Sequence, residues 1–349
     1  MAFITFKGVG IKAISACVPS QKVFNKDLGY FMPQDDIEKT INSIGIIEKR
    51  YAEPEVCASD LCFKAAQKLL QDNNINLNSI DVLLFMSQTS DYKIPATAPI
   101  LQHRLGLSKN VAALDLSLGC SGYVYALSTA FAYASMQGVN RVLLLVGETF
   151  SKIVNSHDKV NVPLYGDAGT ATLIEKGDFG DSYFTLGSDG SGADAVKISA
   201  GGCRNIISVD NIKPSKKEDG NIRSDQELFM DGMDVFNFAI SVVPKSIKDV
   251  LLQSNQTLAD IDYIVLHQAN KFMTDFIIKR LKYPLEKVPY CMDRFGNTSS
   301  ASIPLTIVSE LKNKIDSKNL LLCGFGAGLS WGSAVIQTKK CFVSDLIDY

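Results

Sequence analysis

The sequence contains an internal repeat, and this repeat restricts the possible folds more than any other feature. NLNSIDVLLFMSQT at 76–89 resembles QTLADIDYIVLHQAN at 256–270. In both stretches a polar turn with an aspartate, Asp81 or Asp262, leads into an apolar run, and the offset is 262 − 81 = 181. A polar turn that repeats together with its apolar run is a stronger sign of duplication than two similar runs of leucine and valine.

A second pair of apolar runs repeats in the same order. RVLLLVG at 141–147 resembles NLLLCG at 319–324, and Leu143 matches Leu320 at an offset of 320 − 143 = 177. Because the two offsets are nearly equal, we predict that the chain consists of two similar halves. These halves are expected to span residues 1–176 and 177–349.

Strand-like and helix-like segments alternate along the chain, which predicts an α/β fold with buried sheets. Apolar runs predict strands at 81–87, 111–118, 141–148, 263–268 and 319–325. Apolar residues at helical spacing predict helices at 59–71, 121–137 and 301–314. The charged segment 211–225 is expected to form a surface loop or the edge of a lid in the second half.

The composition is that of an ordinary globular protein, with 46% hydrophobic residues and a formal net charge of -2 over 349 residues. A nearly neutral chain gives no reason to expect nucleic acid or a membrane surface as the main partner. The first residues do not have the pattern of a signal peptide, and no apolar run is long enough to span a bilayer. Eight scattered cysteines and three histidines predict free thiols, no metal, no bound cofactor and a cytoplasmic location.

Cys120 stands in the sequence LGCSG, between the predicted strand 111–118 and the helix that follows. The free amides and the dipole of a helix start favour a thiolate, which is the nucleophilic form of cysteine. The alternative is that Cys120 is a small buried hydrophobic residue, as free cysteines usually are. The flanking glycines favour a close approach of the backbone and hence a catalytic role.

Three other stretches place polar or glycine residues at the ends of apolar runs. They are VLHQAN with His267, FGNTSSAS with Asn297, and the glycine-rich GFGAGLSWG at 324–332. Taken singly, His267 is explained as a core histidine, Asn297 as a helix cap and the glycines as a bend. In a duplicated α/β fold, however, the strand ends of both halves can meet in one crevice. There Cys120 is a nucleophile, His267 an acid/base or donor, and free amides an oxyanion hole.

The order Cys, His, Asn is also that of papain-like proteases, and the gap 267 − 120 = 147 fits them. The residues after Cys120 are SGYVY, however, and not the CGSCW-type signature of those enzymes. The nucleophile also lies in the middle of a duplicated chain. A Cys-His-Asn hydrolase therefore remains the weaker reading.

The motifs LGCSG, YGDAG, HQAN, GNTSSAS and GFGAGLSWG together resemble β-ketoacyl-acyl-carrier-protein synthase III, of the thiolase-like superfamily. The resemblance covers nearly the whole chain and implies a layered αβαβα fold of two similar halves. It implies Cys120 as the acyl-accepting nucleophile, completed by His267 and Asn297, with an oxyanion hole at the amides of Cys120 and Ala327. The implied reaction is acyl transfer to Cys120, followed by decarboxylative Claisen condensation with a malonyl thioester that is carried by acyl carrier protein.

Other members of the superfamily fit less well. Thiolases use a second cysteine, but Cys323 is one residue out of step and on a strand position that faces the other way. Hydroxymethylglutaryl-CoA synthases use a glutamate where this chain has Gln88. A degenerate partner subunit is disfavoured because all three polar residues are present. An acyltransferase that passes the acyl group to an amine or a hydroxyl would use the same cysteine and histidine, and it stays open.

The segments that bind the acyl donor depart from the family. The resemblance places Lys39, Ser43 and Lys159 where the family has a tryptophan and two arginines against the adenine of acetyl-CoA. Lysine has no planar guanidinium to stack on a base. We therefore expect the donor to be a carrier-bound acyl group or an unusual acyl-CoA, rather than acetyl-CoA. The alternative is that Tyr30 or Phe31 provides the stacking surface.

The resemblance also implies partners. Asn270 of HQAN is expected to contact substrate, and the helix after it, with Lys271 and Arg280, is expected to dock the carrier protein. Phe272 stands in this helix where the family usually has arginine. The family forms homodimers in which each subunit lends a residue to the partner's pocket, and Ile94 is at about that position.

Overall fold

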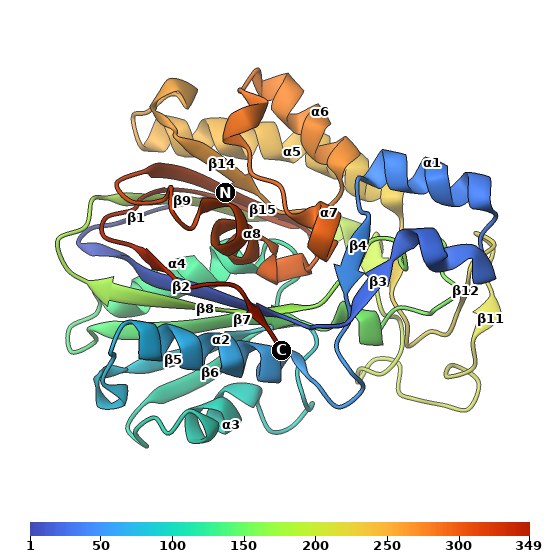
Figure 1. Cartoon of the computed structure of the whole chain (residues 1–349), viewed down its shortest axis with the longest axis horizontal. Coiled ribbons are helices and arrows are strands. Elements are labelled where there is room, and N and C mark those ends of the chain that lie inside the picture. The colour runs from blue at the N-terminus through green and yellow to red at the C-terminus, as the bar shows by residue number, and fades with distance from the viewer.

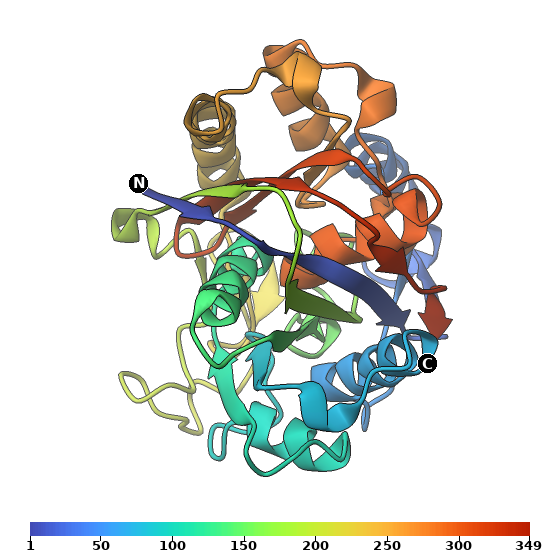
Figure 2. The same cartoon turned by 90° about the vertical axis from the view of Figure 1, so that its left-hand side faces the viewer.

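The computed structural model describes residues 1–349 and has five layers. Two sheets lie face to face, with a pair of helices between them and further helices on each outer face (Figures 1 and 2). This is the αβαβα arrangement that the family resemblance implied. Each sheet is buried on both faces, which explains why its strands are nearly continuous apolar runs.

The sheet of the first half has the strand order β17-β2-β8-β7-β5-β6, and β18 also pairs with β2. Strand β5 runs parallel to both β6 and β7, while β8 is antiparallel to β7 and β2. The strands are β2 (Val9–Val18), β5 (Val82–Met86), β6 (Ala112–Leu116), β7 (Arg141–Glu148), β8 (Ala168–Lys176), β17 (Phe342–Val343) and β18 (Ile347–Asp348).

The sheet of the second half has the order β1-β9-β16-β15-β14. Strand β14 is parallel to β15, and the other pairs are antiparallel. The order β9-β16-β15-β14 therefore repeats β2-β8-β7-β5 of the first half. The strands are β1 (Ala2–Phe6), β9 (Ser182–Ser188), β14 (Tyr263–Leu266), β15 (Asn319–Gly326) and β16 (Ser330–Gln337).

The pairing of the strands corrects one of the two predicted offsets. Val82 pairs with Val142, and Tyr263 pairs with Leu320. The offset between β5 and β14 is thus 263 − 82 = 181 as predicted, but between β7 and β15 it is 320 − 142 = 178, not 177. The predicted match of Leu143 with Leu320 was wrong by one residue, which exchanges the two faces of a strand. Leu143 faces the outer helices, whereas Leu320 faces the middle layer.

The termini are exchanged between the two halves. Strand β1 belongs to the sheet of the second half, and β17 and β18 belong to the sheet of the first half. A division of the chain near 176–182 therefore assigns the central strands to their own sheets, but it does not do so for the strands at the two termini. A boundary at 177 describes the repeat but not two separable domains, because each sheet contains strands from both ends of the chain.

The helices lie in three layers, as Figure 1 shows. The middle pair is α4 (Gly122–Ser135) and α8 (Ser302–Leu311), while α2 (Ala58–Asp72) and α3 (Thr97–Arg104) cover the first sheet. The second sheet is covered by α5 (Gly232–Gln253) and α6 (Lys271–Leu281). Side chains cap two of these helices, since Asp231 accepts hydrogen bonds at the start of α5 and Asn270 at the start of α6.

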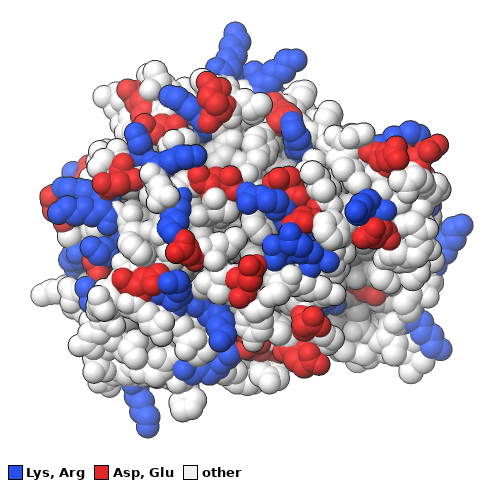
Figure 3. Space-filling view, viewed as in Figure 1, with Lys and Arg blue, Asp and Glu red and all other residues white.

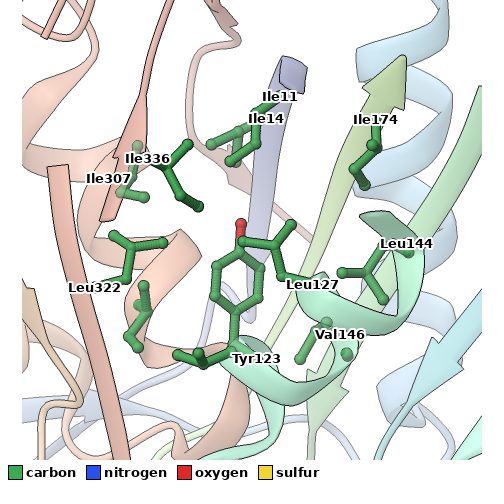
Figure 4. Close-up of a cluster of buried hydrophobic side chains, with 14 of the residues drawn as sticks. Ile11, Ile14, Tyr123, Leu127, Leu144, Val146, Ile174, Ile307, Leu322 and Ile336 are labelled. Atoms are coloured by element: carbon green, nitrogen blue, oxygen red, sulfur yellow. The ribbon is translucent and has the colours of Figure 1, made fainter. Parts of the chain in front are cut away.

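The middle layer contains the largest core. Tyr123 and Leu127 of α4 and Ile307 of α8 pack between Ile14 of the first sheet and Leu322 of the second (Figure 4). All of these side chains are fully buried. Because both sheets use the same two helices as a core, the halves form one unit rather than two lobes.

The remaining elements lie mostly at one end of the sheets, on the right in Figure 1. They include α1 and the antiparallel pair of strands β3 and β4, and the predicted loop 211–225 forms the small β11–β12 hairpin on the surface. The ranges are β3 (Lys22–Phe24), α1 (Gln34–Ile44), β4 (Glu48–Arg50), β10 (Val196–Lys197), β11 (Ser215–Lys216), β12 (Ile222–Arg223), β13 (Phe229–Met230) and α7 (Met292–Phe295). Short 3₁₀ helices are η1 (Asn25–Tyr30), η2 (Leu77–Ser79), η3 (Phe150–Lys152), η4 (Gly190–Gly192), η5 (Leu258–Asp260), η6 (Leu285–Lys287) and η7 (Ser299–Ala301).

Candidate active site

Cys120 lies in the turn between β6 and α4, at the meeting point of the two halves. The second half approaches it closely, since the Sγ atom is 3.7 Å from the Oγ atom of Ser299. A Cβ atom on Gly326 would lie 2.8 Å from the Cβ of Cys120 and 3.0 Å from its Sγ. Gly326 also has a φ of 152°, so a side chain is excluded both by space and by the backbone conformation. The glycine-rich strand thus allows the backbone to pass directly against the sulfur.

Backbone amides are directed at the same sulfur. The N–H groups of Ala327 and of Cys120 itself both stabilise its thiolate. These are the two amides that the family resemblance assigned to the oxyanion hole. An oxygen that develops negative charge next to the sulfur would find two donors already in place.

His267 follows β14 and is 1% exposed, with its amide donating to the carbonyl of Cys323 over 2.8 Å. Its Nδ1 atom is 2.8 Å from the Oγ of Ser302 at the start of α8. Because Nδ1 is engaged by this hydroxyl, Nε2 is the ring nitrogen that remains for a ligand. The edge of the ring also packs against Phe325, with 5.5 Å between the ring centroids.

Asn297 is held in the loop before α8 by its own backbone. Its N–H donates to Leu164 over 2.8 Å, and its carbonyl accepts from Gly166 over 3.1 Å. The side-chain Oδ1 accepts the amide of Ser299 over 2.8 Å. The Nδ2 donor has no such partner and stands at the wall of the cavity.

One cavity of about 220 Å³ joins these residues. Its polar wall carries Gln88, Cys120, Lys197, His267, Asn270 and Asn297, together with Ala327. Most of the remaining wall is apolar and includes Phe150, Ile153, Leu164, Leu228, Met230 and Met273. Phe150 and Tyr165 stack with 4.8 Å between their ring centroids. A thiol, an imidazole and an amide therefore face a chamber that is large enough for an apolar group.

The protonation states differ from the thiolate that the helix start predicted. Burial raises the pKa of Cys120 to about 11, and the charge of Glu148 adds to this, although Ser299 and the two amides act in the opposite direction. Burial lowers the pKa of His267 to about 3. Desolvation thus outweighs the helix amides, and the resting site holds a neutral thiol and a neutral imidazole.

Known proteins share this architecture over the whole chain. Two models of the 3-oxoacyl-[acyl-carrier-protein] synthase III family match residues 114–190 and residues 251–338, the latter being the C-terminal model. A β-ketoacyl-[acyl-carrier-protein] synthase III of Rhodopirellula baltica is 35% identical, over 95% of this chain and 99% of its own. The chain belongs to the 3-oxoacyl-acyl-carrier-protein synthase III family.

Solved structures of synthase III proteins agree with this membership. The 3-oxoacyl-(acyl-carrier protein) synthase of Burkholderia xenovorans superposes with a TM-score of 0.94 at 36% identity, covering 100% of this chain and 99% of its own. The synthase III of Thermus thermophilus gives a TM-score of 0.82 at 33% identity, covering 94% and 98%. The predicted family and the predicted thiolase-like fold are both confirmed.

Not all of the residues that the synthase III resemblance assigned to substrate lie in the cavity. Asn270 is part of the cavity wall, whereas Lys39, Ser43 and Lys159 are exposed and are not among the residues that line it. Instead, an aromatic cluster lies on the surface near Lys159. The ring centroid of Tyr30 is 4.7 Å from that of Phe31 and 5.8 Å from that of His157.

The predicted docking and partner residues are all on the surface. Lys271 and Arg280 are exposed on α6, where Lys271 pairs with Asp275. Phe272 is 56% exposed and stacks on Phe236 of α5 with 5.4 Å between the centroids. Ile94 is 88% exposed. Cys323 is buried among the outer helices and does not line the cavity, so it offers no second thiol to the synthase site.

Sequence reasoning missed one buried acid next to the site. Glu148, the last residue of β7, is fully buried, and burial raises its pKa to about 7. Its position at the end of the RVLLLVGE run was visible, but an acid there has no sequence signature. No group of three or more histidine, cysteine, aspartate or glutamate side chains is arranged to hold a metal ion. None of the helices combines the length and the apolar character that crossing a membrane requires.

Proposed function

We propose that this synthase III family member takes an acyl group onto Cys120 and condenses it with a malonyl thioester, giving a 3-oxoacyl thioester. One observation carries the proposal. A thiol, a neutral imidazole, a free carboxamide donor and two oxyanion-binding amides face a single largely apolar cavity. A cytoplasmic enzyme of fatty-acid or specialised biosynthesis fits this chemistry.

In the first half-reaction, Sγ of Cys120 attacks the carbonyl carbon of an acyl thioester. The amides of Cys120 and Ala327 stabilise the oxyanion that forms. The new S–C bond replaces the donor's C–S bond, and the proton of Cys120 ends on the departing thiol.

In the second half-reaction, a malonyl thioester replaces the departed thiol. Carbon dioxide leaves, and the electrons of the broken C–C bond form an enolate on the thioester carbonyl. Hydrogen bonds from His267 and Asn297 stabilise this enolate, whose carbon then attacks the acyl carbonyl on Cys120. The C–S bond to Cys120 breaks, and the sulfur takes up one proton. The apolar cavity wall supports the loss of carbon dioxide, because a carboxylate is poorly solvated there.

The donor is proposed to be a carrier-bound acyl group or an acyl-CoA other than acetyl-CoA. The exposed Lys39 and Lys159 offer point charges but no planar cation to stack on adenine. The apolar wall around Phe150, Leu228 and Met230 suits a larger acyl group. An apolar cavity of 150 Å³ in another protein holds benzene, and the cavity here has about 220 Å³. This volume has room for more than an acetyl group.

Two macromolecular partners are proposed on the surface features. Acyl carrier protein is proposed to meet Lys271 and Arg280, which are exposed on α6. Charges of both signs are interspersed over the face seen in Figure 3, so this docking depends on a local group of cations and not on a large basic field. A second copy of the chain would pair at β6, one of the two edge strands of its sheet, and bring Ile94 toward the partner's cavity.

Intact-mass analysis against a panel of donors tests the function. The panel contains acetyl-CoA, longer acyl-CoAs and acyl groups on carrier protein, with Cys120→Ala as the blank. We expect a longer or carrier-bound acyl group to add its mass to Cys120 faster than acetyl, and malonyl-carrier protein then to release a 3-oxoacyl thioester and carbon dioxide. Transfer to an amine or hydroxyl would establish the acyltransferase alternative, and release as free acid would establish the hydrolase.

A further inference from the structure

The buried carboxyl of Glu148 lies where the two halves meet, and the proposed chemistry leaves it without a role. It is surrounded by donors and not by a cation. Ser300 donates to it over 2.8 Å, Thr89 over 2.8 Å, Ser87 over 3.2 Å and the amide of Gln88 over 3.1 Å. A buried carboxyl without a cationic partner is costly, so a sequence keeps one only where its contacts or its charge matter.

These contacts join two segments that form opposite sides of the nucleophile turn. The 87–89 loop carries Gln88 into the cavity, and the Oε1 of Gln88 would be 3.0 Å from a Cβ on Gly119, the residue before Cys120. Ser300 belongs to the second half and follows Ser299, whose hydroxyl is 3.7 Å from the sulfur. Glu148 therefore connects both walls of the turn through one carboxyl group.

The charge of Glu148 reaches the same turn. It raises the pKa of Cys120 and, more weakly than burial does, that of Cys62 on α2. The other groups that face the carboxyl, from the 87–89 loop and from η7, are hydroxyls and an amide and carry no charge. Nothing next to Glu148 neutralises its effect on the sulfur once it ionises.

We propose that Glu148 is a positioning residue of the synthase site that holds Gln88 and Ser300 around Cys120 and whose ionised form adds to the burial that keeps the resting nucleophile in its thiol form. A thiol resists alkylation and oxidation, which both need the thiolate. The carboxyl thereby protects the nucleophile between turnovers. The proposal rests on Cys120 being the nucleophile, but its test reads the sulfur directly and needs no acyl donor.

The wild-type enzyme provides the first test. The rate of alkylation of Cys120 by iodoacetamide is measured by peptide mapping across neutral pH, with exposed Cys203 as a reference in the same sample. The pKa of Glu148 is raised to about 7, so its charge appears as pH rises through that value. Log rate against pH is expected to rise with a slope near one, flatten near pH 7 as Glu148 ionises, and then rise again. A single straight line for Cys120 would overturn the role of the charge.

Two substitutions separate the charge from the contacts. Glu148→Gln removes the charge but keeps an acceptor, so the flat region should vanish and alkylation at pH 8 should become about threefold faster or more. Glu148→Ala also removes the contacts, and acylation by the donor found above should then fall about tenfold or more. Asp167→Asn is the matched control, because it neutralises another buried carboxyl, whose pKa is raised to about 6, at a place whose charge does not act on Cys120. Equal alkylation and acylation in all four proteins would overturn the proposal.

Discussion

The two halves of the molecule share a frame but differ at the residues that end its central strands. In the first half Asp81 accepts the amide of Arg141 over 3.0 Å, and in the second half Asp262 accepts the amide of Asn319 over 2.8 Å. Each aspartate also donates its own amide to the carbonyl of the same residue. The 3₁₀ turns η2 and η5 precede the two aspartates at the same offset of 258 − 77 = 181.

The equivalent strand ends carry different chemistry. At the offset of β5 and β14, Met86 corresponds to His267, since 86 + 181 = 267. At the offset of β7 and β15, Glu148 corresponds to Gly326, since 148 + 178 = 326. Thus one half ends in an apolar side chain and an acid, and the other in an imidazole and no side chain at all. The duplicated frame therefore serves the packing of both halves, while the one active site takes different parts from each copy.

Removal of the nucleophile, which only the first half provides, should have the largest effect on activity. Cys120→Ala should abolish the acyl-enzyme and lower condensation by at least about 10⁴-fold, because removal of a catalytic nucleophile has effects of this size or more. The control is Cys323→Ala, which removes a buried thiol outside the cavity. Intact mass and turnover are the measurements. Acylation of Cys120→Ala at the wild-type rate would mean that the nucleophile lies elsewhere.

The second half is expected to contribute mainly to decarboxylation. His267→Ala and Asn297→Ala should each lower carbon dioxide release from the malonyl thioester about 10²–10³-fold, the usual cost of one lost donor to an oxyanion. Some acylation of Cys120 should remain in both variants. The measurements are carbon dioxide release and intact mass in parallel. Equal and complete loss of acylation in the two variants would contradict this division between the halves.

Gly326 is the residue of the second half that corresponds to Glu148, and a side chain there should displace the nucleophile Cys120. Gly326→Ala would put a Cβ 3.0 Å from the sulfur of Cys120. Displacement of the nucleophile by such a contact should lower acylation about 10²-fold. Gly190→Ala is the control, since its Cβ would meet no atom within 4 Å. Stopped-flow measurement of the acylation rate compares the two variants. A rate for Gly326→Ala equal to that of the control would show that the added methyl group does not displace the sulfur.

Substitutions in the frame that the two halves share should have the smallest effects, and the effects on the two halves should be nearly equal. Asp81→Ala and Asp262→Ala each remove a carboxylate that accepts a backbone amide at the start of a central strand. Each should lower the free energy of unfolding by about 1.5–3 kcal/mol, as expected for a hydrogen bond to a charged group. Urea denaturation measures both. A much larger loss in one of them would show that the two halves do not depend equally on this feature.

Much of the fold could be predicted from the sequence, because burial of parallel strands on both faces produces apolar runs that are easy to recognise. The strands at 141–148 and 319–325 lie where they were expected, within one residue. The convergence of Cys120 and His267 was also predictable, because each follows a strand of one of the two sheets. Asn297 follows the short helix α7 instead, and its place in the site was implied by the family resemblance. The register between the runs at 141–147 and 319–324 could not be predicted, because two leucine-rich runs can be aligned one residue apart almost equally well.

The electrostatics of the site could not be predicted from local sequence. The start of α4 suggested a thiolate at Cys120, but the sulfur is covered by residues from the other half, and burial decides its pKa. Lys39 and Lys159, which the resemblance assigned to the adenine of the donor, are exposed and outside the cavity, and this assignment stays a prediction. Glu148 is distant in sequence from every catalytic motif and becomes part of the site only because β7 ends beside Ser300.

The sequence by itself determined the layered fold, the duplication and the three side chains available for chemistry, because periodicity, turn residues and motif order are local properties of a chain. Only the tertiary structure decided how those side chains are protonated and which neighbours hold them. The physical reason is that desolvation and Coulomb interactions act through space. The groups that shift the pKa of Cys120 come from β7, from η7 and from the turn after β15, and they are separated from Cys120 along the chain by as many as 327 − 120 = 207 residues.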